Sequence, residues 1–173
     1  ATQADDSCHT NANCENYGTT YYQAKQTAAH IDMGGYVCSG NLINNTAEDC
    51  TPLFITASHC EGTSSFRDAT FARWRFYFNY ETATCPAGGA VNVAQYVTGA
   101  KFKTRSVLPS ASNPNDQSLR ADHLLLELNT TKDVLESYDA YLGGWDRMLD
   151  VPTAAAEKLW VNFSHPNGLR KKI

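Results

Sequence analysis

The chain has 173 residues, of which 42% are hydrophobic, so a packed domain is expected and a disordered chain is excluded. Its net charge of −4 argues against nucleic acid and anionic membrane surfaces as partners, because both attract basic proteins. No apolar run approaches the roughly 18 residues of a membrane-spanning helix, and we expect no membrane partner.

Residues 1–20 are polar and predict an extended arm held by its cysteines. Short apolar segments bounded by Asn, Gly and Pro follow, a pattern typical of an all-β barrel or sandwich. A polar loop is expected at 106–120, and one or two helical turns within 153–160. The expected strands lie at 36–45, 52–59, 71–80, after Gly88-Gly89, at 122–128 and at 159–163.

The segment Phe71–Tyr80 alternates aromatic with polar residues. This period of two predicts a strand with one buried face. Trp74, Phe76 and Phe78 share that face, and we expect them in the core.

Six cysteines are spread singly along the chain, and none forms a Cys-x-x-Cys pair. A zinc ribbon or a thioredoxin-like site therefore has no support, and the spacing is typical of the disulfides of exported proteins. We expect an extracellular or periplasmic protein, although the sequence does not choose among the possible pairings. The disulfide candidates are Cys8, Cys14, Cys38, Cys50, Cys60 and Cys85.

His59 ends an apolar strand in the run Thr-Ala-Ser-His-Cys. A lone histidine is most often structural, but a disulfide at Cys60 would hold this one rigidly, and Cys38 is a suitable partner on an earlier strand. A general base needs such a fixed ring. No two histidines have the spacing of a metal-binding motif, so we expect no metal and no cofactor.

Asp122 begins the apolar strand Asp-His-Leu-Leu-Leu-Glu-Leu. One interpretation is an Asp that caps the strand; the other is a carboxylate that orients a histidine ring. Asp116 and Asp68 are weaker candidates because both lie in polar segments.

The runs CSGNLINN, PLFITASHC and ADHLLLELN resemble the segments around the catalytic histidine and aspartate of trypsin-like serine proteases. With the early cysteine pair, FNYETATC, GGWDR and HPNG in the same order, the chain is most similar to the N-terminal portion of bacterial lysyl endopeptidases. Any one of these runs alone is weak evidence of the family, whereas the ordered set across nearly the whole chain is strong evidence.

The resemblance implies a trypsin-like double β-barrel in which His59 is the general base and Asp122 orients it. The expected division is an arm at 1–20, an N-terminal barrel at 21–130, and the inter-barrel connection with the first strands of the C-terminal barrel at 131–173. It also implies the disulfides Cys14–Cys85 and Cys38–Cys60, and Cys8 bonded to the C-terminal barrel. Cys50 has no settled partner; Cys8 and a residue beyond this chain are the alternatives.

The family's nucleophile lies in a Gly-rich segment downstream of HPNG, and Ser39, Ser58 and Ser164 do not fit that context. We therefore expect the serine on a second polypeptide or a missing segment that carries the C-terminal barrel. The basic run at 169–173 is interpreted as an exposed loop, and nicking after Ile173 is favoured over a fragment.

The function expected from these features is secreted serine endopeptidase activity on proteins or peptides, after Lys or another basic residue. One alternative is a catalytically inactive trypsin-like fold that binds proteins. Another is a disulfide-stabilised β-sandwich binding module whose aromatic strand at 71–80 presents its rings to solvent.

Overall fold

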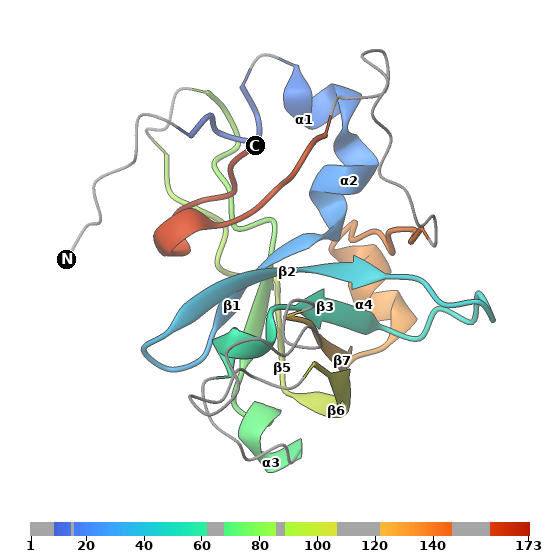
Figure 1. The fold of residues 1–173 in the computed structure, drawn as a ribbon. Coiled ribbons are helices and arrows are strands. Elements are labelled where there is room, and N and C mark those ends of the chain that lie inside the picture. The colour runs from blue at the N-terminus through green and yellow to red at the C-terminus, as the bar shows by residue number, and fades with distance from the viewer. Residues whose placement is uncertain (1–8, 15, 62–67, 86–88, 107–121, 147–159) are drawn as a thin grey trace, which may run out of the picture.

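A computed structural model of the chain describes residues 9–14, 16–61, 68–85, 89–106, 122–146 and 160–173 (Figure 1). Its described strands form one curled antiparallel sheet in the order β5-β4-β1-β2-β3-β7-β6. The prediction of a mostly β fold is thus confirmed. The strands are β1 (Ala28–Asp32), β2 (Val37–Ile43), β3 (Leu53–Thr56), β4 (Arg75–Phe78), β5 (Tyr96–Thr98), β6 (Ala100–Arg105) and β7 (Leu124–Leu128).

The two edges of this sheet meet at Gly99, the residue that separates β5 from β6. Its N–H donates to the Trp74 carbonyl at 2.8 Å, and its own carbonyl accepts from the Asn129 N–H at 3.0 Å. Gly99 has φ +84°, and a Cβ there would lie 2.7 Å from the Asn129 amide nitrogen. A glycine is therefore required where the chain passes from one edge to the other.

Aromatic and aliphatic side chains from all seven strands fill the interior of the curled sheet. Trp74, Phe76 and Phe78 are at most 5% exposed, which confirms their predicted place in the core. Phe76 packs edge-on against Phe54, with ring centroids 5.0 Å apart. A binding module that presents these rings to solvent is contradicted, because the rings are inside the sheet.

Four short helices and two 3₁₀ turns complete the described fold, and none of these helices has the length and apolar character needed to cross a membrane. Two of the helices differ from expectation. One ends at residue 71, where a strand was predicted, and the other follows β7 and was not expected from the sequence. That helix buries Leu135 in the core of the curled sheet. The elements are α1 (Tyr17–Thr20), α2 (Tyr22–Thr27), α3 (Asp68–Phe71), η1 (Ser58–Cys60), α4 (Lys132–Ser137) and η4 (Pro166–Gly168).

The expected arm at 1–20 is not extended throughout, because α1 occupies its end, and residues 1–8 lie outside the described part of the chain. Likewise, the strand expected at 159–163 is irregular over its described residues, and only Ser164 forms an isolated bridge, with Lys172. The expected loop at 106–120 and helix at 153–160 fall almost entirely outside the described residues.

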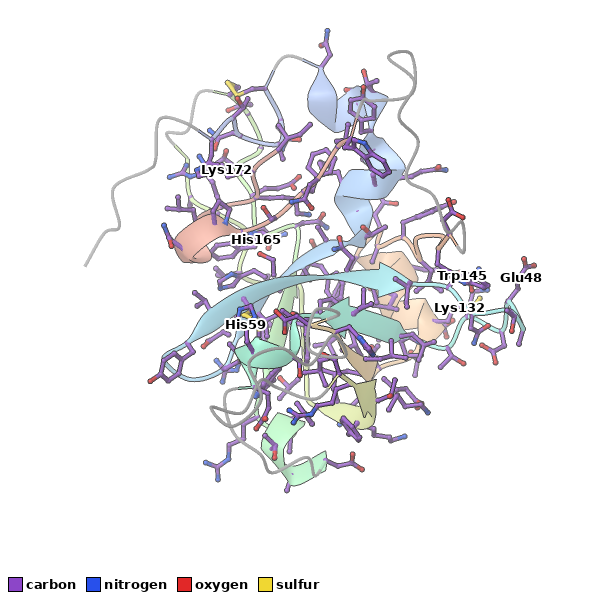
Figure 2. All side chains as sticks on the ribbon, viewed as in Figure 1. Glu48, His59, Lys132, Trp145, His165 and Lys172 are labelled. Carbon is purple, nitrogen blue, oxygen red and sulfur yellow. A yellow bond between two sulfur atoms is a disulfide. The ribbon has the colours of Figure 1, made fainter. Side chains whose placement is uncertain are left out.

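The C-terminal segment 160–173 lies against the N-terminal residues and the outer side of β1 and β2 (Figures 1 and 2). Lys172 forms an antiparallel bridge with Asn11, and Lys171 donates its N–H to the Tyr80 carbonyl at 2.8 Å. Both lysines are at most 2% exposed. The prediction of an exposed basic loop at 169–173 is therefore wrong, because buried acceptors take both ammonium groups.

Candidate active site

His59 lies on the 3₁₀ turn η1, directly after β3. Ala57 continues the extended backbone of β3 and precedes the turn, and the Cys60 N–H donates to the Ala57 carbonyl at 3.2 Å. The preceding residue, Ser58, is completely buried. The turn thus holds the histidine backbone against the curled sheet while 67% of the His59 side chain stays exposed.

Asp122 lies just before β7, and its carboxylate contacts His59 twice. Oδ2 lies 2.6 Å from Nδ1 of the ring, and Oδ1 accepts the His59 backbone N–H at 3.0 Å. The structure therefore brings together the two site residues predicted from the sequence. Asp68 lies elsewhere, where it accepts the Phe102 N–H at 2.8 Å, and Asp116 is outside the described residues.

The charge of Asp122 decides which ring nitrogen of His59 carries a proton. Burial opposes the ionised form, but hydrogen bonds from the His59 ring and backbone lower the pKa of Asp122 below its usual value. An ionised carboxylate can only accept, so in the neutral ring Nδ1 donates and Nε2 carries the lone pair. This is the arrangement that a general base requires.

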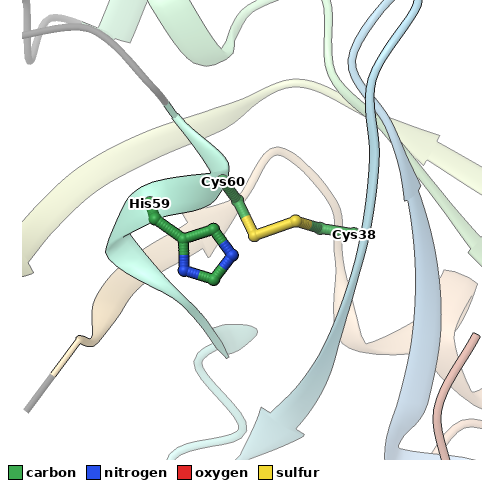
Figure 3. Close-up of side chains that lie close together, drawn as sticks. All are labelled: Cys38, His59 and Cys60. Atoms are coloured by element: carbon green, nitrogen blue, oxygen red, sulfur yellow. A yellow bond between two sulfur atoms is a disulfide. The ribbon is translucent and has the colours of Figure 1, made fainter. Parts of the chain in front are cut away.

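A disulfide between Cys60 and Cys38 links the His59 turn to β2 (Figure 3). The structure also contains Cys14–Cys85, so two of the three disulfides that the resemblance implies are present. Cys38, His59 and Cys60 form a group of potential metal ligands within 4.8 Å, but both sulfurs are committed to the disulfide and cannot bind as thiolates. Cys50 is a half-buried free thiol, and Cys8 lies outside the described residues.

Replacing both Cys38 and Cys60 by alanine is expected to lower the free energy of unfolding by about 3 kcal/mol, because the bond closes a loop with a sequence separation of 22. The melting temperature should fall by roughly 10 °C. Cys50→Ala is the control and should change little, since Cys50 forms no disulfide within the described part of the chain. Equal melting temperatures for the double variant and the wild type would contradict a stabilising role for this bond.

The described serines do not supply a nucleophile to His59. Within the described part of the chain, Nε2 has no hydrogen-bond partner. The Ser39 hydroxyl accepts the His165 N–H at 2.7 Å, the Ser58 hydroxyl donates to the Ser106 carbonyl, and Ser164 bridges to Lys172. Two hollows of about 430 and 510 Å³, near α2 and residues 160–163, include neither His59 nor Asp122.

A pair of histidines, not anticipated from the sequence, is buried between β1 and the C-terminal segment. His30 and His165 are 6% and 2% exposed, with ring centroids 5.3 Å apart, and His30 stacks on Tyr80. Burial lowers the pKa of both, and the neighbouring Lys171 ammonium lowers that of His165 further. The sequence carries no signal for this pair, because its members come together only when the segment docks.

This pair predicts that the protein loses stability in mild acid. Unfolded histidine binds a proton near pH 6.5 and the buried rings do not, so stability falls as the pH drops from there, by up to about 1.4 kcal/mol per pH unit for each ring. Urea midpoints measured between about pH 7 and pH 5 should show this slope. His165→Gln should reduce the slope and the control His123→Gln should keep it; an unchanged slope in His165→Gln would contradict the assignment.

Comparison with known proteins identifies a matching family and similar curated proteins. The family described as "Lysyl endopeptidase, C-terminal domain" matches residues 2–173. The lysyl endopeptidase of Pseudomonas aeruginosa is 30% identical over 177 aligned positions, which cover 98% of this chain. The chain spans 34% of that relative's length.

Proposed function

The chain belongs to the lysyl endopeptidase C-terminal domain family, and on that premise we propose that it supplies the general base and the orienting carboxylate of a serine endopeptidase. The observation that carries the proposal is the contact of 2.6 Å between His59 Nδ1 and Asp122 Oδ2, with the rest of the ring exposed. The disulfide at Cys60 and the family together also favour a secreted protein.

The chemistry follows from the two ring nitrogens. Nε2 of His59 removes the proton of a serine hydroxyl while that oxygen attacks the scissile carbonyl carbon. The proton then passes from Nε2 to the leaving amine, and an acyl-enzyme remains. Water, activated by the same nitrogen, releases the acid and restores the serine. Throughout, Asp122 holds Nδ1–H and stabilises the imidazolium.

The serine and its oxyanion hole are proposed to lie in a second β-barrel, outside the described residues. The side of this second barrel that faces His59 would cover the exposed part of the ring, and the two barrels together would form a double barrel. Exposed aromatic side chains in the proposed connection support a further packing partner, since Trp145 and Trp160 are 48% and 67% exposed. The described part of this chain would then be the N-terminal barrel and the start of the connection to the second.

Substrates are proposed to be proteins or peptides cut after lysine, on the printed name of the family and of its Pseudomonas relative. A lysine-reading pocket needs a buried carboxylate at its base. Among the described residues, the buried Glu61 and the largely buried Glu81 contact arginine and lysine of this chain, so the specificity residue is proposed to lie on the second barrel.

The test is to treat the complete native protein with a fluorophosphonate probe and to locate the label by mass spectrometry. We expect one labelled serine in a Gly-rich segment, cleavage of peptides after lysine, and loss of both in His59→Ala. A folded protein that takes no label and cuts no peptide would reduce the proposal to a catalytically inactive trypsin-like fold that binds proteins.

A further inference from the structure

We propose that Ser58 and Ser106 form a serine clamp that positions the His59–Asp122 pair. Ser106 follows directly on β6, and neither serine contacts the reacting atoms. The clamp joins the three chain segments that meet beneath the site: η1, the end of β6 and the start of β7. The effect of the clamp on catalysis rests on the proposed function, whereas its effect on the geometry of the His59–Asp122 pair does not.

Ser106 holds the segment that carries Asp122 through two reciprocal hydrogen bonds to the next residue. Its N–H donates to the His123 carbonyl at 2.8 Å, and its hydroxyl oxygen accepts the His123 N–H at 2.9 Å. The side chain thus continues the pairing of β6 with β7 by one residue beyond the last strand pair, Arg105 with Leu124. Asp122 is fixed from its C-terminal side as a result.

Ser58 connects this block to the histidine turn. Its hydroxyl donates to the Ser106 carbonyl at 3.1 Å, and its N–H donates to the Asp122 carbonyl at 3.2 Å. Because Ser58 is completely buried and Ser106 is 7% exposed, water cannot readily replace the bond between them. The η1 turn and the end of β6 are also linked by Glu61 and Arg105, whose side chains approach to 3.9 Å.

The backbone of Asp122 explains why such a clamp is needed. Its φ is +33°, in the left-handed half of conformational space that a non-glycine residue rarely adopts. A conformation of that kind persists only where the surrounding structure holds it. Among the described residues, the clamp and the two bonds to His59 hold it here. Without the clamp, we expect the carboxylate to move relative to Nδ1.

A small movement of this carboxylate has a large effect on proton transfer. A misplacement of about 1 Å in an active site costs on the order of a hundredfold in rate. Ser106→Ala and Ser58→Ala should each lower kcat by roughly tenfold or more and leave KM little changed, because neither serine reaches the substrate. Ser106→Thr, which keeps the hydroxyl, should restore most of the rate.

The experiment uses the complete protein labelled with ¹⁵N-histidine and follows the Nδ1 proton of His59 by NMR, alongside kcat, KM and melting temperature. Thr82→Val is the matched control: Thr82 is 2% exposed and donates its hydroxyl to a backbone carbonyl, that of Thr84, also at 3.1 Å. Thr82 is not part of the clamp, because it lies beside Asn13, whose side-chain amide donates to the Thr82 carbonyl. The Nδ1 signal should broaden or shift in both serine variants and stay in place in Thr82→Val and Ser106→Thr.

The two readouts separate the clamp from the proposed function. An unchanged Nδ1 signal and an unchanged kcat in both Ser58→Ala and Ser106→Ala would overturn the clamp. A signal that responds as expected in a protein that reacts with no fluorophosphonate would support the clamp and overturn the proposed function. A fall in rate that Thr82→Val reproduces, with no change in the Nδ1 signal of any variant, would overturn the clamp and assign the loss to stability.

Discussion

Asp122→Asn in the complete protein is expected to lower kcat by about four orders of magnitude, with little change in KM. Oδ1 of Asp122 accepts the backbone N–H of His59, so the amide oxygen of asparagine should take that position. Its NH₂ group then faces Nδ1 across the 2.6 Å contact. Two donors cannot share this bond, so the ring must move its proton to Nε2, which leaves no base for the proposed serine nucleophile.

Asp68→Asn is the matched control for this variant. Asp68 also accepts a backbone N–H through Oδ1, that of Phe102, but it contacts no histidine. Its amide oxygen can keep that bond, and we expect peptide cleavage within about twofold of the wild type, as for most surface substitutions. Equal losses in the two variants, or no loss in Asp122→Asn, would contradict the assigned role of Asp122.

The sequence was sufficient to predict the parts of this molecule that depend on local pattern. Alternation of residue types placed Trp74 and Phe76 in the core, and their burial follows from the period of a strand. His59 and Asp122 were identifiable because each ends or begins an apolar strand beside small or polar residues. Their contact needed the added premise of a family resemblance, since 63 residues separate them.

The parts that could not be predicted depend on contacts between distant segments. Ser106 has no distinctive sequence context, and its link to His123 exists only because β6 pairs with β7. The basic run at 169–173 was misjudged for a related reason. Lysine is almost always exposed, and only a partner at position 81, far along the chain, allows Lys171 to be buried.

Glu81→Gln is expected to lower the free energy of unfolding by about 3–5 kcal/mol near neutral pH, the cost of breaking a buried ion pair. Glu81 lies between Lys25 on α2 and Lys171 on the C-terminal segment, at 2.6 and 3.3 Å. Burial opposes its ionisation, but the two ammonium groups lower the pKa of Glu81 below its usual value. Glutamine would leave two buried cations without a counter-charge.

The pH dependence of this loss identifies its electrostatic origin. Burial lowers the pKa of Lys171 to about 8, and Glu81 keeps it from falling further. In Glu81→Gln, native Lys171 should therefore release its proton at a lower pH than in the wild type. The unfolded chain keeps that proton in both proteins, so the stability deficit should shrink as the pH rises towards about 8. In acid, it should also shrink once Glu81 of the wild type is protonated.

Glu127→Gln is the internal comparison, because Glu127 also lies between two lysines. Lys101 and Lys103 contact it at 3.4 and 2.8 Å, but their side chains are 59% and 44% exposed. Water and salt screen such pairs, and we expect a loss below about 1 kcal/mol in urea unfolding. A loss from Glu81→Gln no larger than that from Glu127→Gln would mean that water reaches Glu81 and its two lysine partners. The C-terminal segment would then be held by its backbone bonds to Tyr80, Ala12 and Thr10 rather than by buried charge.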